Sequence, residues 1–353
     1  DADQVKAAVG NANALWVRTP ERVTADIMDA APGLTVISTS GFGTDNIDIP
    51  AATERGILVV THLGFGRTPV AEHTVMLLLA CLKQLTWGDR AARDGTAWSQ
   101  RQGLQVYELE GRTVGIVGLG YIGSELAKKL RLAFNCRVLA YDPYVNARLA
   151  LVTGVEMCAD LHAMLAQCDA LAMAAELTDE TRNMIGAAEL AALPEGAVVV
   201  NAARGALIDL AALDAALSSG HIRAAGLDVV FPEPLPADHA LLKNPKVIFT
   251  PHTAGGTQES RGLGQPAVAA AGLGTQWPAD SVRKVRFAVE CRRFLSLSGT
   301  FVSSQGRAMT FLSHNDRETL PPFPPYVGEF GQSGLGPQLK NCRAFIGGRY
   351  HWL

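Results

Sequence analysis

The sequence lacks any apolar run of about 20 residues, the length that a membrane-spanning helix requires. Its most apolar stretch, Val75 to Leu79 followed by Cys81 and Leu82, is too short and predicts a buried helix. A basic and apolar leader is also missing, so we expect no secretory signal. The six cysteines are scattered without a Cys-x-x-Cys pair, which disfavours a zinc site or a disulfide framework and indicates reduced thiols in the cytoplasm.

Charge is sparse as well. Charged residues make up 18% of the chain and the net charge is −3, so we expect neither a nucleic acid nor a membrane partner. Hydrophobic residues make up 48% of the 353 residues, which is typical of a globular α/β protein long enough for two domains.

The last quarter of the chain differs from the rest. Residues 261–353 carry 11 Lys+Arg against 5 Asp+Glu, a balance of +6, whereas the preceding residues balance at −9. This segment is rich in arginine, glycine and proline and shows little helical periodicity. We therefore expect an atypical tail over 260–353 that is irregular, and non-native or disordered.

The most specific pattern is a glycine-rich turn between a predicted strand (113–117) and a predicted helix (124–133). In the sequence Gly-x-Gly-x-x-Gly, Gly118 allows a sharp turn, Gly120 lets a pyrophosphate approach the backbone, and Gly123 lets the helix pack closely on the strand. The start of that helix then offers unpaired N–H groups to phosphate. The alternative is a glycine turn that serves packing alone.

A second predicted strand, Cys136 to Tyr141, ends in Asp142. A carboxylate at this place can accept two hydrogen bonds from a ribose diol and would repel a 2′-phosphate. Because strand, turn, helix, second strand and acid follow one another in order, we interpret the motif as a dinucleotide site that takes NAD rather than NADP.

Strands and helices alternate through most of the chain, which predicts parallel sheets covered on both faces. About seven strands are expected in a doubly wound domain, and further strands before residue 61 in a smaller one. A long apolar helix is expected from Thr68-Pro69 to about Leu85, buried between the domains. It carries the polar pair Glu72 and His73, for which we favour a core hydrogen bond over a role in a site.

Polar clusters follow three of the predicted strands, and a parallel sheet would place them at one edge. The clusters span residues 201–205, 228–234 and 250–255. Singly, each has a plainer explanation: a solvated arginine, a glutamate in a turn, a structural histidine. Together they match hydride transfer to a 2-keto acid. Arg204 can bind the carboxylate and polarise the carbonyl, His252 can move a proton near neutral pH, and Glu233 can orient the His252 ring.

Two glycine-rich loops, Gly41 to Gly43 and Gly64 to Gly66, are expected at the carboxyl ends of strands in the smaller domain. Their backbone N–H groups could hold a substrate carboxylate. Turn chemistry alone explains them equally well.

Taken together, these motifs resemble the D-isomer-specific 2-hydroxyacid dehydrogenase family, in particular its phosphoglycerate dehydrogenase-like branch. Matching elements run from about Asn11 to Glu259. They include Gly43-Thr44-Asp45-Asn46-Ile47-Asp48, Val70-Ala71-Glu72-His73, the Gly118–Gly123 fingerprint, Asn201-Ala202-Ala203-Arg204-Gly205, Asp228-Val229-Val230-Phe231-x-Glu233-Pro234 and Thr250-Pro251-His252-x-Ala254-Gly255.

The resemblance implies a Rossmann-type NAD-binding domain over 87–259 and a smaller flavodoxin-like substrate domain that starts with 1–86. The tail 260–353 would replace the family's returning helix. Implied catalytic residues are Arg204, Glu233 and His252. Implied cofactor contacts are Gly118, Gly120, Tyr121, Ile122, Gly123, Asp142, Ala203, Asp228 and His252. Implied substrate contacts are Ser40, Gly41, Phe42, Gly43 and Arg204.

The resemblance further implies an NAD-dependent oxidoreductase that interconverts a D-2-hydroxy acid and its 2-keto acid, acts on small molecules and forms a homodimer. Two alternatives stay open. Some relatives of this fold are NAD-sensing corepressors that keep the catalytic residues, and the atypical tail could leave an enzyme of this kind impaired.

Overall fold

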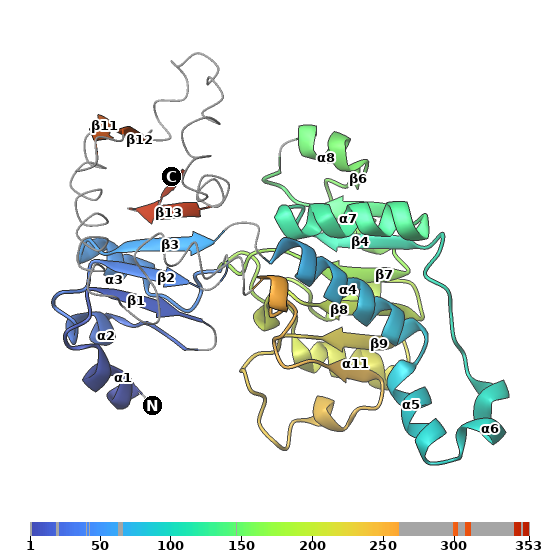
Figure 1. The fold of residues 1–353 in the computed structure, drawn as a ribbon. Helices are drawn as coiled ribbons and strands as arrows, with labels where there is room; N and C mark the ends of the chain where they lie inside the picture. Colours follow the sequence, from blue (N-terminus) through green and yellow to red (C-terminus); the bar gives the residue numbers. More distant parts are fainter. Residues whose placement is uncertain are drawn as a thin grey trace. The chain divides into compact units, whose positions relative to one another are not determined.

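A computed structural model describes residues 2–18, 21–39, 41, 43–62, 66–145 and 147–260, together with the backbone of 299–302, 308–311, 342–346 and 349–352. The chain divides into two compact units (Figure 1). One comprises Asp1–Phe65 with Gln258–Leu353, and the other comprises Gly66–Thr257. Within the described residues, no helix combines the length and the apolar character that a membrane span requires.

The first unit is built on a parallel sheet. Its strands are β1 (Ala14–Val17), β2 (Val36–Thr39) and β3 (Leu58–His62), and its helices are α1 (Ala2–Val9), α2 (Ala25–Asp29) and α3 (Ile49–Glu54). Apolar residues of the strands and helices, among them Val17, Met28, Ile37 and Val59, form its core. This unit confirms the expected smaller α/β domain.

Four short strands come from the tail. β13 (Cys342–Ile346) adds to β3 in antiparallel orientation and β14 (Arg349–Trp352) follows it, while β11 (Gly299–Val302) pairs with β12 (Ala308–Phe311). The remainder of 261–353 lies outside the described residues. The expectation of an irregular, non-native tail therefore stays a prediction.

The second unit is a seven-stranded parallel sheet of the doubly wound type, as expected. Its strands are β4 (Thr113–Val117), β5 (Arg137–Tyr141), β6 (Glu156–Met157), β7 (Ala170–Met173), β8 (Ala197–Asn201), β9 (Ile222–Leu227) and β10 (Val247–Phe249). Their order is β10-β9-β8-β7-β4-β5-β6. The order reverses between β4 and β7, and ligands of such sheets bind at the carboxyl ends of the strands beside that reversal.

Helices cover both faces of this sheet (Figure 1). One face is covered by α4 (Arg67–Leu82) and α7 (Tyr121–Phe134), and the other by α9 (Leu161–Leu165), α10 (Ala187–Ala192) and α11 (Leu210–Ser219). Alternate strand residues point to opposite sides: Val198 and Val200 join the α4–α7 core, whereas Val199 joins the other core. The central strands β4, β7 and β8 are therefore buried over nearly their whole length, as a sheet covered on both faces requires.

The remaining elements lie around this sheet. They are α5 (Leu85–Arg93), α6 (Ala97–Gln100), α8 (Ala147–Thr153) and the 3₁₀ turns Arg101–Gly103, Gly205–Leu207 and Ala240–Lys243.

Helix α4 belongs to the second unit, which comprises Gly66–Thr257. The domain boundary expected at residue 86 stays a prediction. The helix begins at Arg67, so Pro69 lies in its first turn, where the missing N–H leaves no bond unmade. Gly226 of β9 allows its close approach, since a Cβ there would lie 2.9 Å from the Cβ of Leu77.

Candidate active site and dinucleotide crevice

The three glycines of the fingerprint differ in their surroundings. Gly118 has φ +92°, and a Cβ on it would lie 2.5 Å from the backbone N of Ala175 after β7. A Cβ on Gly123 would lie 2.1 Å from the carbonyl oxygen of Gly118. A Cβ on Gly120 would meet nothing within 4 Å. Gly118 and Gly123 are thus required by the turn and by packing, while the Gly120 side is open in the way that an approaching pyrophosphate needs.

Asp142 lies directly beside the fingerprint. Its Oδ2 accepts a hydrogen bond from the N–H of Leu119 at 2.8 Å, and its Oδ1 accepts one from the N–H of Tyr144 at 3.0 Å. A carboxylate has about four acceptor positions, so two remain. These residues fit a dinucleotide that carries a free ribose diol.

The loop after β8 is shaped by the buried side chain of Asn201. Its Oδ1 accepts from the N–H of Ala203 at 3.0 Å, and its Nδ2 donates to the carbonyl of Arg204 at 2.8 Å. Arg204 is half-buried and its Nη1 donates to the carbonyl of Ala203 at 2.7 Å. A Cβ on Gly205 would lie 2.0 Å from the backbone of Val230, so the loops after β8 and β9 pack directly together.

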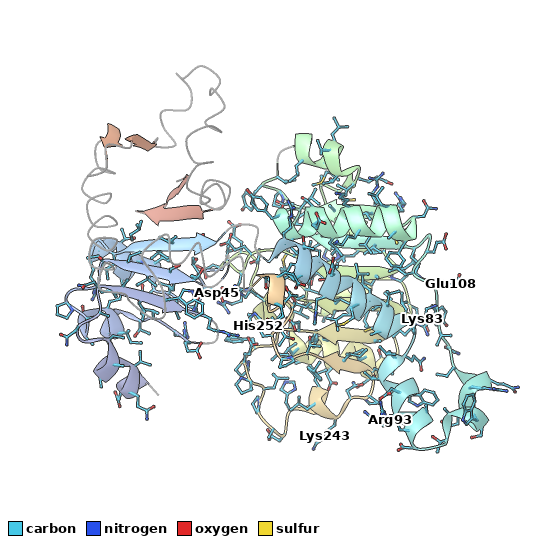
Figure 2. The ribbon with its side chains drawn as sticks, in the orientation of Figure 1. Asp45, Lys83, Arg93, Glu108, Lys243 and His252 are labelled. Carbon is cyan, nitrogen blue, oxygen red and sulfur yellow. The ribbon has the colours of Figure 1, made fainter. Side chains whose placement is uncertain are left out.

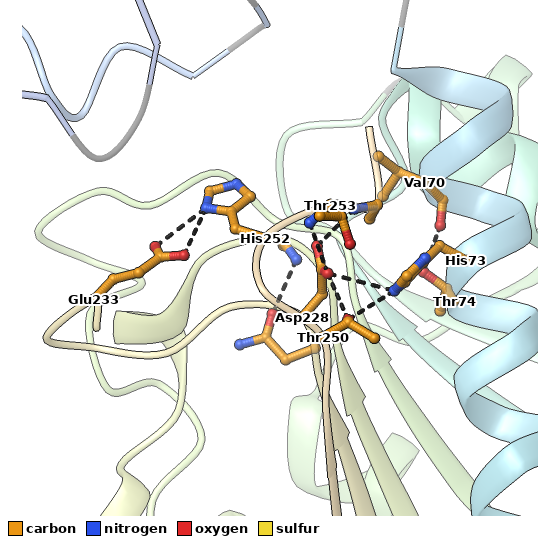
Figure 3. Close-up of polar contacts among 11 residues, drawn as sticks. Val70, His73, Thr74, Asp228, Glu233, Thr250, His252 and Thr253 are labelled. Atoms are coloured by element: carbon orange, nitrogen blue, oxygen red, sulfur yellow. Dashed lines mark hydrogen bonds and ion pairs between the residues drawn. The ribbon is translucent and has the colours of Figure 1, made fainter. Parts of the chain in front are cut away.

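His252 and Glu233 form a close pair (Figure 3). Nδ1 of His252 lies 2.9 Å from Oε1 and 3.1 Å from Oε2 of Glu233, and about a quarter of each side chain is exposed. Because a carboxylate accepts only, we assign the Nδ1 hydrogen to this contact. The ring thereby presents Nε2, the other nitrogen, for proton transfer.

The backbone of His252 is left-handed, with φ +51°. For a residue other than glycine this conformation costs on the order of 1–3 kcal/mol and persists only where surrounding contacts enforce it. The N–H of His252 donates to the carbonyls of Asp228 and Thr250 at 2.8 and 3.0 Å. Both acceptors lie at the carboxyl ends of neighbouring strands, β9 and β10.

Asp228 is the buried centre of these contacts (Figure 3). Its Oδ1 accepts from the hydroxyl of Thr250 at 2.5 Å and from the N–H of Thr253 at 3.0 Å, and its Oδ2 accepts from the N–H of Ala254 at 3.0 Å. The sequence suggested Asp228 as a cofactor contact, which stays a prediction. Its carboxylate holds the loop that carries His252.

The expected substrate loop belongs to the first unit. Gly41 and Gly43 are described, and the Thr39 hydroxyl donates to the carbonyl of Gly41 at 2.5 Å. Ser40 and Phe42 lie outside the described residues. The role of this loop in binding substrate stays a prediction.

The contact of His73 with the candidate site was not predicted from the sequence. Nε2 of His73 lies 2.8 Å from the hydroxyl oxygen of Thr250 and 3.4 Å from Oδ1 of Asp228. The favoured core hydrogen bond exists, but its partner Thr250 belongs to the His252 loop, and the nearby Asp228 holds that loop. Glu72, the neighbour of His73, instead pairs with Lys129 at the surface, 3.1 Å away. The sequence feature that could have indicated this contact was a histidine in an otherwise apolar helix.

A further group of charged residues lies away from this site. A hollow lined by Lys83, Glu108, Arg112 and Asp169 lies at the amino-terminal edge of the sheet, where β4 and β7 begin. Figure 2 labels Lys83 and Glu108. Among the described residues, no group of three or more His, Cys, Asp or Glu could hold a metal ion.

Comparison with known proteins places these features in context. The model of the D-isomer specific 2-hydroxyacid dehydrogenase NAD binding domain matches residues 75–254. D-3-phosphoglycerate dehydrogenase of Mycobacterium tuberculosis is 41% identical over 261 residues, covering 74% of this chain and 48% of that protein. Hydroxypyruvate reductase of Thermotoga maritima is 36% identical over 264 residues, covering 74% and 84%.

A crystal structure of a Thermus thermophilus protein is also similar, with a TM-score of 0.70 and 33% identity over 82% of this chain and 87% of that one. The chain spans about half the length of the phosphoglycerate dehydrogenases that it matches.

Proposed function

Since this chain belongs to the D-isomer specific 2-hydroxyacid dehydrogenase family, we propose that it interconverts a D-2-hydroxy acid and its 2-keto acid. The cofactor is NAD, because the matched segment is the family's NAD binding domain. The observation that carries the proposal is the His252–Glu233 pair, which lies at the same sheet edge as the fingerprint.

The chemistry follows from three side chains. When bound, the reduced nicotinamide supplies the hydride that the C2 carbon of the keto acid receives. His252 donates a proton from Nε2 to the carbonyl oxygen, so that the hydroxyl forms, and takes it back in the oxidation direction. Glu233 fixes the orientation of the ring and the nitrogen that carries its hydrogen. Arg204 binds the substrate carboxylate and polarises the carbonyl through its planar guanidinium.

The test is consumption of NADH with saturating hydroxypyruvate, glyoxylate or phosphohydroxypyruvate, in the wild type and in Arg204→Ala and His252→Ala. Removal of an acid/base group lowers the rate by about 10²- to 10⁴-fold, and we expect this for His252→Ala. The chain offers a matched control in His162, which also pairs with a glutamate, Glu189 at 3.0 Å, on the sheet face covered by α9 and α10.

We expect His162→Ala to keep wild-type turnover. A full rate in His252→Ala would show that the acid/base assignment is wrong. Binding of NADH without turnover of any of the three acids would instead indicate an NAD-sensing binding protein.

We propose a substrate of the phosphoglycerate type, on the similarity to phosphoglycerate dehydrogenases and on Arg18, which follows β1 and is exposed. An arginine there can meet a phosphate. Arg18→Ala should raise KM for phosphohydroxypyruvate and leave KM for glyoxylate unchanged. An equal effect on both acids would contradict this assignment.

A homodimer and a cytoplasmic location are further proposals. Helix α4 and the residues after it present Met76, Leu79 and Leu85 in an apolar hollow, and Met76 and Leu85 are 42% and 58% exposed. An exposed apolar patch is typical of a contact with another chain. Sedimentation of Met76→Lys should show a smaller species than the wild type, and an unchanged mass would count against this surface.

A further inference from the structure

We propose that His73 is a positioning residue for the acid/base His252, and that it acts through Thr250 and Asp228. The inference rests on the proposed function, since it concerns the same site. His73 lies on α4, is 15% exposed, and points from the helix to the carboxyl end of the sheet (Figure 3). It touches neither His252 nor Glu233 in any described contact, so its influence on the reaction has to pass through the loop.

The direction of each hydrogen bond follows from counting hydrogens. The hydroxyl of Thr250 has one hydrogen, and its 2.5 Å contact with the Asp228 carboxylate uses it, because a carboxylate accepts only. Toward His73, 2.8 Å away, the Thr250 oxygen is therefore the acceptor. His73 must carry its hydrogen on Nε2. The hydrogen-bond chain thus runs from His73 to Thr250 to Asp228, each member donating to the next.

This series of hydrogen bonds ends at the carboxylate of Asp228, which holds the loop that carries His252. Asp228 accepts from Thr250, two residues before His252, and from the N–H groups of Thr253 and Ala254, just after it. One buried carboxylate therefore clamps both sides of a residue whose backbone is left-handed. His73 connects this clamp to α4, the helix on which the loop rests.

Packing supports the same connection. Val70, one turn before His73, forms an apolar cluster with Ala202 and Ala254, and Ile122 of α7 packs against it. The cluster joins α4 to the loops after β8 and β10. Apolar contact fixes the distance of the loop from α4 but not its direction, whereas the His73 hydrogen bond fixes a direction.

Loss of this hydrogen bond leaves the Thr250 hydroxyl oxygen without its donor and lets the loop shift. A misplacement of about 1 Å in an active site costs about 10²-fold in rate. The fingerprint glycines follow β4, which is separated from β9 by the two strands β8 and β7, so NADH affinity should change much less than turnover. The expected signature is a fall in kcat with little change in KM.

The test compares substitutions of His73 that differ in where they place a donor. In His73→Gln the side-chain amide nitrogen lies about as far from the backbone as Nε2 of the wild-type histidine. In His73→Asn the amide nitrogen is closer to the backbone, at about the place of the histidine Nδ1. We expect kcat near wild type for Gln, and a drop of about 10- to 100-fold for Asn and His73→Leu, with KM for the keto acid within about threefold. The neighbouring Glu72→Gln, whose side chain pairs at the surface, is the control and should be unaffected.

Thr250→Val tests the route. If His73 acts through Thr250, the double variant His73→Leu/Thr250→Val should be no slower than the slower single variant, because both changes interrupt the same series of hydrogen bonds. Additive losses, or equal kcat in His73→Gln and His73→Asn, would overturn the proposal. The Gln and Asn comparison decides the question even if His73→Leu does not fold.

A spectroscopic readout separates this proposal from the proposed function. The Nδ1 proton of His252, held by Glu233, should give a downfield NMR signal that is missing in His252→Ala. We expect it to persist in His73→Gln and to broaden or disappear in His73→Asn. If no keto acid is turned over, the proposed function fails while this signal still tests the role of His73; an identical signal in both variants would refute that role.

Discussion

Glu233 binds the ring of His252 with both carboxylate oxygens on a single nitrogen, Nδ1, at 2.9 and 3.1 Å. The two residues come from loops that follow neighbouring strands, β9 and β10. The carboxylate therefore fixes both the orientation of the ring and the nitrogen that carries the hydrogen. In the proposed mechanism, Nε2 is the nitrogen that transfers the proton.

We predict that Glu233→Gln lowers kcat/KM by about 10²- to 10⁴-fold with little change in folding. The glutamine amide can donate a hydrogen to Nδ1, which selects the wrong tautomer of the ring. The measurement is steady-state oxidation of NADH. Glu189→Gln, which alters the other His–Glu pair of the described residues, His162–Glu189, should keep kcat. Similar losses in both variants would indicate an unspecific effect on stability.

The fingerprint glycines should separate folding from cofactor binding. In Gly123→Ala the new Cβ would lie 2.1 Å from the Gly118 carbonyl oxygen. We expect a loss of about 3 kcal/mol in the free energy of unfolding, which exceeds the gain of about 1 kcal/mol in helix propensity. The measurement is urea denaturation followed by circular dichroism.

Gly120→Ala is the matched variant, because a Cβ there meets nothing within 4 Å and φ is −75°. Its stability should stay within about 1 kcal/mol of the wild type. Its Kd for NADH should rise about tenfold or more, since the Cβ occupies the side on which the pyrophosphate approaches. If Gly120→Ala bound NADH normally, the interpretation of the fingerprint would be wrong.

The sheet and its order of elements could be predicted from the sequence because the central parallel strands are nearly continuous apolar runs bounded by glycine and polar residues. Val198-Val199-Val200 before Asn201 is an example, and the structure places β8 there. The grouping of Arg204, Glu233 and His252 at one edge followed from the same reasoning. In a parallel sheet, loops that leave neighbouring strands lie together.

The contacts of His73 and Asp228 could not be predicted in this way. Their contact depends on how closely α4 approaches β9 and β10, and His73 and Thr250 are 177 positions apart in the chain. Periodicity shows which helix face is buried but not which polar group a single histidine on that face will meet. For a related reason, the apolar character of α4 does not show which sheet the helix covers.

Asp142 should determine the preference for NAD. Loss of charge-assisted hydrogen bonds costs about 1.5–3 kcal/mol, which corresponds to roughly 10- to 100-fold in affinity. Asp142→Ser should therefore weaken NADH binding by that factor and improve NADPH binding, because the repulsion of the 2′-phosphate is removed. Fluorescence titration with both cofactors measures the ratio, and a ratio equal to that of the wild type would exclude Asp142 as the determinant.

The described cysteines should differ in reactivity. Burial raises the pKa of the Cys81 and Cys168 thiols to about 12 and that of Cys136 to about 11. Burial also raises the pKa of Cys158, whose side chain is partly exposed. Only the thiolate reacts. Because the folded chain holds these protons more tightly than the unfolded chain, their contribution to stability is complete below about pH 9 and is lost as the pH rises toward 12.

A thiol reagent applied at pH 8 to a Cys291→Ser/Cys342→Ser variant should therefore modify Cys158 first. Cys81, Cys136 and Cys168 should react only as fast as the second unit opens, since their thiolates form only when water reaches them. NADH binds the folded state alone and should slow these three reactions in proportion to 1 + [NADH]/Kd, while the reaction of Cys158 is unaffected if it proceeds without unfolding. Rapid modification of Cys81 in the presence of NADH would contradict the packing of α4 against β9.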